Sequence, residues 1–283
     1  MNLPFLKDDA LLTDIRSADE GADHFLIWWL GQSGFLVKWN HQFLLFDPYL
    51  SDSLTKKYAN SDKPHVRMTE LVVDPGKLDF IDVITSSHNH TDHLDAETIA
   101  ALHAANPDLK LVLPEANMDF ARERLGQSTP ELLGLDEGKS QLVGDFKFTG
   151  IAAAHNEIAR DADGRCHYLG FVVEFGPWCI YHSGDTLWHP GLVPALGPFK
   201  PTLMLLPING NRPERRVAGN LNGAEAATLA RACNANMVIP CHYDMFEFNT
   251  ESPDEFANTC ERIRQPHQVL VNGERWTSRS IEI

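Results

Sequence analysis

The chain has 283 residues, of which 43% are hydrophobic and 22% are charged, and this balance excludes a disordered chain because it supplies enough apolar material for a core. Its formal net charge of −15 disfavours binding to phosphate backbones and to anionic lipid surfaces. We therefore expect no nucleic-acid partner and no membrane partner. The length fits one large α/β domain that spans residues 1–283.

The five cysteines indicate a reducing compartment, because their number is odd and no two have the Cys-x-x-Cys spacing of a thiolate metal site. The N-terminal stretch MNLPFLKDDALLTD has acidic residues soon after a short apolar patch, which is not the pattern of a signal peptide. No run reaches the roughly 18 apolar residues of a membrane span. The sequence thus predicts a cytoplasmic protein.

Strands dominate the beginning of the chain. Three short apolar runs with tight polar breaks between them predict an antiparallel meander over residues 24–30, 34–39 and 42–50. The pattern then changes to a strand, a helix and a strand, over residues 80–87, 95–106 and 109–114. Asp95 is the predicted N-cap of this helix.

The second half of the chain repeats this order. Three further apolar runs predict strands over 146–155, 167–175 and 178–185. Strands at 202–208 and 237–242 then alternate with helices at 222–234 and 253–263, before a last pair of strands at 267–271 and 275–283. Because strand-rich and alternating stretches occur twice, we predict an α/β fold with two sheets face to face and helices on the outside.

Two irregular stretches, 51–68 and 209–222, are rich in Gly, Pro, Ser and charge and are predicted to be loops. Long loops in a compact fold are candidates for the rim of a substrate site. Their basic residues either meet an anionic substrate group or form a solvated basic surface. These residues are Lys56, Lys57, Arg67, Arg212, Arg215 and Arg216.

The stretch SSHNHTDHLD, residues 86–95, places four titratable side chains just after an apolar strand. They are His88, His90, Asp92 and His93. Neutral imidazole and carboxylate are ordinary ligands of divalent ions such as zinc, iron and manganese. A rigid strand followed by a loop is able to aim several of them at one ion. The alternative is a solvated turn that happens to be rich in histidine.

Side chains of the same kind follow three later strands, at His155, Asp185 and His242. With the first cluster they make seven candidates, enough for two metal ions that share a carboxylate. The alternative for His155 alone is a buried core histidine. Asp185 is also a candidate N-cap of a helix at 186–193, a role compatible with metal ligation. His182 and His65 fall outside this pattern. By strand alternation His182 belongs to the core or behind the ligands, whereas His65 has a surface or packing role.

The pattern H-x-H-x-D-H, followed in order by the later His, Asp and His, resembles the metallo-β-lactamase superfamily. The resemblance implies a four-layer αββα sandwich of two mixed β-sheets flanked by helices. It also implies two divalent ions, zinc or manganese, with iron as a further candidate. By the same resemblance, one ion is held by His88, His90 and His155, the other by Asp92, His93 and His242, and Asp185 bridges them.

Four stretches, WWLGQSGFLVK, DPYLSD, YHSGDT and IPCHYDMF, are similar to the subgroup that includes L-ascorbate-6-phosphate lactonase. This similarity implies a metal-dependent hydrolase that acts on a small lactone or related ester, phosphorylated sugar lactones included. A metal site open to solvent supplies hydroxide near neutral pH as the nucleophile. Asp92 would be the catalytic residue that orients this hydroxide and carries a proton to the leaving oxygen.

Three other functions remain open at this stage. A small phosphodiester hydrolase uses the same dinuclear centre but usually has an extended basic groove. A mononuclear iron oxidoreductase needs only one set of ligands, such as His88, His90 and His155, and a non-catalytic binding protein is expected to have lost ligands. The full set of seven ligands favours two metal ions, and we expect a hydrolase whose substrate is small and anionic. A homo-oligomer is compatible with all of these functions.

Overall fold

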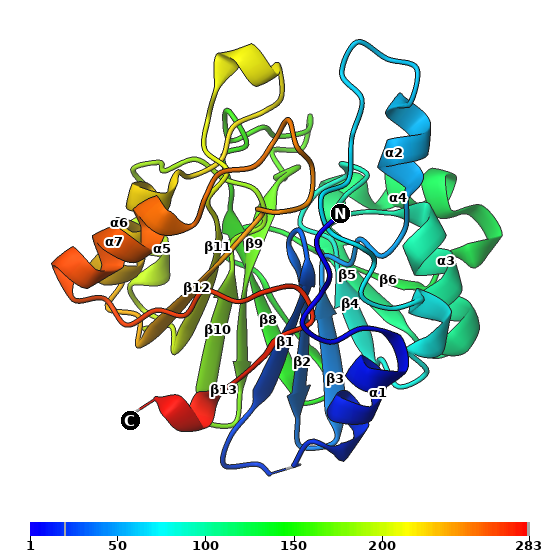
Figure 1. Cartoon of the computed structure of the whole chain (residues 1–283), viewed down its shortest axis with the longest axis horizontal. Helices are drawn as coiled ribbons and strands as arrows, with labels where there is room; N and C mark the ends of the chain where they lie inside the picture. The colour runs from blue at the N-terminus through cyan, green and yellow to red at the C-terminus, as the bar shows by residue number, and fades with distance from the viewer. Residues whose placement is uncertain (20, 282–283) are drawn as a thin grey trace.

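Two β-sheets pack face to face between outer helices in the computed structural model, which describes residues 1–19 and 21–281 (Figure 1). The seven-stranded sheet has the order β13-β1-β2-β3-β4-β5-β6, and the six-stranded sheet has the order β12-β11-β10-β9-β8-β7. Both sheets contain parallel and antiparallel pairs. The predicted α/β sandwich of two mixed sheets flanked by helices is confirmed.

The seven-stranded sheet combines the predicted N-terminal meander with the strands that follow it. Strands β13, β1, β2 and β3 pair antiparallel, whereas β3, β4, β5 and β6 pair parallel. Since β3 and β4 are parallel, the loops after them leave the same edge of the sheet. The strands are β1 (Leu26–Gly31), β2 (Gly34–Trp39), β3 (Gln42–Phe46), β4 (Val83–Thr85), β5 (Lys110–Pro114), β6 (Glu131–Leu135) and β13 (Arg275–Thr277).

The six-stranded sheet is antiparallel from β7 to β10 and parallel from β10 to β12. Strands β8, β10 and β12 therefore run in one direction, and the loops after them meet at one edge. The strands are β7 (Ser140–Val143), β8 (Phe146–Ala152), β9 (Leu169–Phe175), β10 (Trp178–His182), β11 (Leu203–Pro207) and β12 (Met237–Cys241).

Helices cover the outer face of each sheet (Figure 1). As predicted, Asp95 caps a helix, because its carboxylate accepts a hydrogen bond from the Thr98 backbone N–H at 3.2 Å. Among the helices of the described residues, none has both the length and the apolar character that a membrane crossing requires. The helices are α1 (Asp8–Ser17), α2 (Ser53–Tyr58), α3 (Ala96–Ala105), α4 (Met118–Leu125), α5 (Leu192–Leu196), α6 (Gly223–Ala232) and α7 (Asp254–Ile263).

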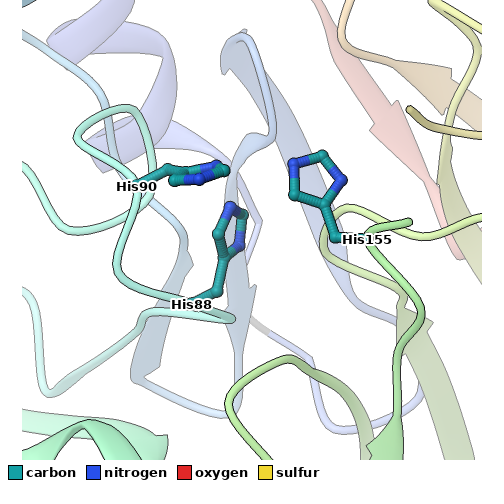
Figure 2. A group of neighbouring side chains, drawn as sticks. All are labelled: His88, His90 and His155. Carbon is teal, nitrogen blue, oxygen red and sulfur yellow. The ribbon is translucent and has the colours of Figure 1, made fainter. Parts of the chain in front are cut away.

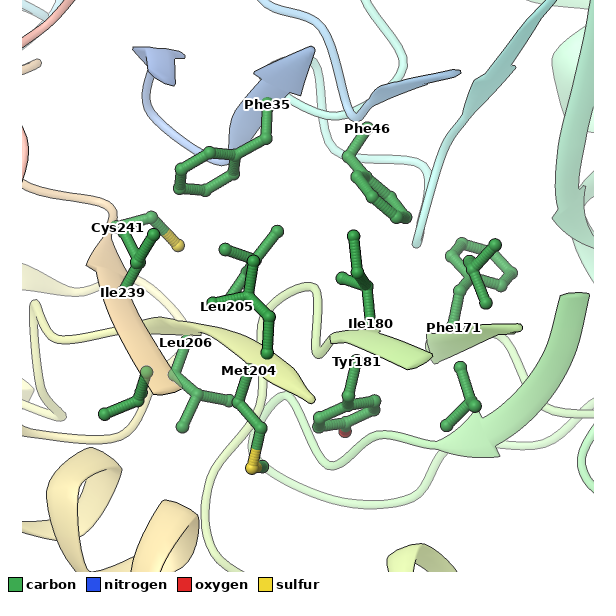
Figure 3. Close-up of a cluster of buried hydrophobic side chains, with 14 of the residues drawn as sticks. Phe35, Phe46, Phe171, Ile180, Tyr181, Met204, Leu205, Leu206, Ile239 and Cys241 are labelled. Atoms are coloured by element: carbon green, nitrogen blue, oxygen red, sulfur yellow. The ribbon is translucent and has the colours of Figure 1, made fainter. Parts of the chain in front are cut away.

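The core lies on both faces of the sheets, which explains why the strands are apolar at nearly every position. In β1, Ile27 and Trp29 belong to the core between the sheets, and Trp28 belongs to the core under the outer helices. Figure 3 shows Phe35 and Phe46 of one sheet above the buried strands of the other. Full burial of each such side chain stabilises the fold by about 1.5–3 kcal/mol.

Three predicted segments differ from the structure. The loop predicted at 51–68 contains α2, because Leu54 and Tyr58 lie four residues apart and form one apolar helical face. The strand predicted at 267–271 makes only one bridge, between His267 and Val238, at the edge of the sheet. The last strand ends at Thr277, where a 3₁₀ turn follows, and residues 282–283 of that prediction lie outside the described residues.

Candidate metal centre

All seven predicted ligands converge at one edge of the sandwich, in loops that follow strands. The first four residues lie in the loop after β4, and the other three follow β8, β10 and β12. Gly184 permits this convergence, because its φ is +57° and a Cβ there would lie 2.4 Å from Ser87 Cβ. Asp185 caps no helix, since α5 begins only at Leu192.

The first group consists of His88, His90 and His155, whose rings point toward one another (Figure 2). One ligand atom of each lies within 4.8 Å of the others. The Nδ1 of His155 is 3.0 Å from the Gly219 carbonyl oxygen, so this nitrogen carries the proton and donates. Its Nε2 is therefore left with a lone pair for a metal ion.

The second group consists of Asp92, His93 and His242, whose ligand atoms also lie within 4.8 Å of one another. Asp185 lies between the two groups. One of its oxygens is 3.4 Å from His93 Nε2, and the other is 3.4 Å from His242 Nε2 and 3.7 Å from His155 Nε2. Both oxygens thus face candidate ligand nitrogens, which is where a bridging carboxylate would lie.

Several ligand atoms at this centre have no hydrogen-bond partner in the described part of the chain. These buried atoms are His88 Nε2, His93 Nε2 and Asp185 Oδ1. Each buried polar atom left unpaired costs about 1–3 kcal/mol. A divalent cation would satisfy all three, and imidazole with carboxylate is a donor set suited to zinc, manganese or iron. The residues present therefore fit a metal site.

The charges at the centre are also arranged for metal binding. Burial, with the neighbouring His93 and His90 rings, holds the pKa of His88 well below its ordinary value, so His88 is neutral. Burial alone would lower the pKa of His93, but the Asp185 and Asp92 carboxylates raise it well above the ordinary value. Burial would raise the pKa of Asp185, yet His242 and His93 hold it well below. A divalent ion bound here would compete with the proton for His93 Nε2.

Asp47, which sequence reasoning did not single out, holds His93 in place. This buried carboxylate accepts hydrogen bonds from His93 Nδ1–H at 2.8 Å and from Thr85 Oγ1 at 2.6 Å. Such an outer carboxylate orients a ligand histidine and sets which of its nitrogens faces the metal. A signal was present in the sequence, because Asp47 directly follows an apolar strand, as the ligands do.

Gln32, at the tip of the β1–β2 hairpin, is a second residue that sequence reasoning missed. Its amide Nε2 donates to Asp92 Oδ2 at 2.7 Å and lies 3.0 Å from His242 Nε2. The backbone carbonyl oxygen of Gln32 accepts a hydrogen bond from the His242 backbone N–H at 3.0 Å. The hairpin tip thus contacts two members of the second group at once.

His182 lies outside the candidate metal centre. Its ring stacks on Phe46 in the core, as predicted.

A pocket of about 410 Å³ opens above the centre and includes ligands from both groups in its lining. Of the six basic loop residues, only Lys57 and Arg216 line it. Arg212 and Arg215 lie outside the lining, and both pair with Glu251. The other ion pairs are Lys56 with Glu97, Arg67 with Asp52 and Arg216 with Asp62.

Comparisons with known proteins match the part of the chain that contains the candidate ligands. A family model described as a beta-lactamase superfamily domain matches residues 26–242, which include every predicted ligand. The chain belongs to this superfamily. A UPF0173 metal-dependent hydrolase of Rubrobacter xylanophilus is 32% identical over 81% of this chain and 85% of its own length. Another, from Opitutus terrae, is 30% identical over 87% of this chain and 96% of its own length.

The beta-lactamase superfamily fold also appears in solved structures. A possible metal-dependent hydrolase from Veillonella parvula has a TM-score of 0.71 at 15% identity, with 89% of this chain and 98% of that one covered. At this identity the likeness shows the fold alone. The resemblance to the ascorbate-phosphate lactonase subgroup stays a prediction.

Proposed function

We propose that this member of the beta-lactamase superfamily, a metal-dependent hydrolase like its relatives, cleaves a small lactone or related ester at two divalent ions. The observation that carries the two-ion proposal is the position of Asp185, whose oxygens face ligand nitrogens of both groups. His88, His90 and His155 would hold one ion, and Asp92, His93 and His242 the other. Zinc and manganese are the first candidates, and iron is the third.

The site residues support hydrolysis. When bound, divalent ions lower the pKa of water to about 7 and polarise a scissile carbonyl group. Asp92 lines the pocket and is partly exposed, so it is in reach of an attacking water and of a leaving oxygen. Burial opposes its ionisation, but His93 and His242 keep its pKa below the ordinary value. The Asp92 carboxylate is therefore available to orient the water and transfer its proton.

The lactone substrate rests on the four motif stretches that resemble the lactonase subgroup. A phosphodiester substrate is less well supported, because the long-loop cations do not form an extended basic groove. Four of the six bind carboxylates and lie outside the pocket lining. Lys57 and Arg216 line the pocket, together with Lys63 and Arg124, and these four cations are placed to meet a small anionic group.

Metal-loaded protein is expected to hydrolyse γ-butyrolactones with a kcat/KM about a hundredfold above that for bis(p-nitrophenyl) phosphate. A phosphorylated sugar lactone in the same panel tests the anionic substrate class. Protein treated with a chelator serves as the control and should be inactive on every compound. Faster cleavage of the phosphodiester would replace the lactonase proposal with the phosphodiesterase alternative.

Shortening Gln32 to asparagine is expected to weaken metal binding at the second group by about 10- to 100-fold, the usual effect of losing an outer contact to a ligand. Asparagine tolerates the positive φ of 51° at this position, so the hairpin is preserved while the amide no longer reaches Asp92. Calorimetric titration with Zn²⁺ measures the change. Gln42→Asn, which alters an amide bonded to Asp145 on the surface, is the matched control. Equal affinities for wild type and Gln32→Asn would exclude this positioning role.

A further inference from the structure

An aromatic wall, formed by Tyr58, His65, Phe246 and Phe248, lines the pocket that contains Asp92. The His65 ring stacks on Tyr58 with centroids 4.3 Å apart and an interplanar angle of 19°. The same ring meets Phe246 and Phe248 edge-on, at 5.1 Å and 4.6 Å. The four rings are therefore in contact through His65, although they come from α2, the loop after it and the loop after β12.

The wall is aromatic, and two lysines of the pocket lining lie over its rings: Lys57 Nζ is 5.2 Å from the centroid of Tyr58, and Lys63 Nζ is 5.8 Å from that of Phe248. Leu54 and Met245 are buried in the small cluster that supports it. Burial lowers the pKa of His65, and its Nδ1 lies 3.2 Å from the Lys63 carbonyl oxygen, so the ring is neutral and held in place. The surface or packing role predicted for His65 is thus too narrow, because the residue also borders the candidate active site. The hydrolytic chemistry described above uses none of these rings.

We propose that the aromatic wall binds a flat aromatic ring of the substrate, so that the preferred ester or lactone has an aryl substituent near its scissile carbonyl group. This inference rests on the proposed function and names its substrate class. Aromatic rings attract one another in stacked and edge-on arrangements beyond the effect of buried area alone. A pocket of about 410 Å³ is of the size that accepts ligands well above a bare lactone ring.

Binding of two lactams, which resist hydrolysis, tests the wall without relying on turnover. The compounds are 5-phenyl-2-pyrrolidinone and 5-cyclohexyl-2-pyrrolidinone, which share the lactam ring and differ in the flatness of the substituent. Calorimetry on metal-loaded protein should show about fivefold tighter binding of the phenyl compound. Equal affinities, or tighter binding of the cyclohexyl compound, would overturn the proposal.

Phe248→Leu keeps an apolar side chain but removes one ring of the wall, so the phenyl-to-cyclohexyl affinity ratio should fall toward one. Tyr58→Leu should act in the same direction, which protects the test against a single poorly folded variant. Phe5→Leu, at a ring that is 65% exposed and outside the pocket lining, should keep the wild-type ratio. A ratio unchanged in both Phe248→Leu and Tyr58→Leu would contradict the assigned role.

The corresponding lactones separate failure of the wall from failure of the proposed function. Hydrolysis of γ-phenyl-γ-butyrolactone in preference to the γ-cyclohexyl compound supports both. If neither lactone is cleaved while the lactam ratio holds, the aromatic subsite stands and the lactonase proposal fails. If both are cleaved equally well and the lactams bind equally, the hydrolase stands and the aromatic subsite is wrong.

Discussion

Replacing Asp92 by asparagine is expected to lower kcat/KM by about a thousandfold while the fold is retained. The amide has nearly the shape of the carboxylate and can still accept the hydrogen bond that Gln32 donates at 2.7 Å. The amide lacks the negative charge that would bind a cation, and it is not basic enough to accept a proton. Proton transfer by a positioned side chain contributes a factor of about 10²–10⁴ to the rate. Steady-state kinetics with a lactone substrate measure the loss.

Asp119→Asn is the matched control for this substitution, because Asp119 is an exposed carboxylate on α4 that pairs only locally with Arg122. It should leave kcat/KM unchanged. Thermal melting should give the same transition for both variants and wild type to within a few degrees. Turnover near the wild-type value in Asp92→Asn would exclude Asp92 both as a ligand and as a proton carrier.

His90→Ala is expected to remove about one metal ion per chain and to abolish hydrolysis. His88, His155 and the shared Asp185 would remain, one ligand fewer than the predicted set, so the first ion should be held much more weakly. The side chain of His90 is exposed, so its removal costs little packing. Elemental analysis before and after dialysis gives the metal content. His103→Ala, in the outer helix α3, should retain wild-type content. Full metal content in His90→Ala would show that His90 is not a ligand.

The part of the site that was predictable from the sequence is the part encoded locally. His88, His90, Asp92 and His93 share one loop, so their spacing alone brings them together. The later ligands were recognisable because each follows an apolar strand, and parallel strands deliver their ends to one edge. The sandwich itself followed from the same alternation of strands and helices, since it depends mainly on burial patterns along the chain.

The missed features all depend on contacts between segments that are distant in sequence. The Gln32 amide reaches Asp92 across 60 positions, and its residue type has no intrinsic link to metal sites. The aromatic wall is visible only once α2 and the loop after β12 lie side by side. The sequence left the role of the basic loops open for a related reason, because Glu251 is 39 positions from Arg212 along the chain and their pairing had no local signature. The predicted strand at 267–271 has the composition of a strand but borders the sheet at one bridge only.

The central claim, a hydrolase that requires two divalent ions, is tested most directly by metal content and turnover measured on the same sample. Metal-free protein is titrated with Zn²⁺ or Mn²⁺, and the ions bound per chain are compared with the rate of lactone hydrolysis. We predict about two ions per chain at saturation and turnover that reaches its maximum only with the second ion. Full turnover by protein without any transition metal would contradict the account.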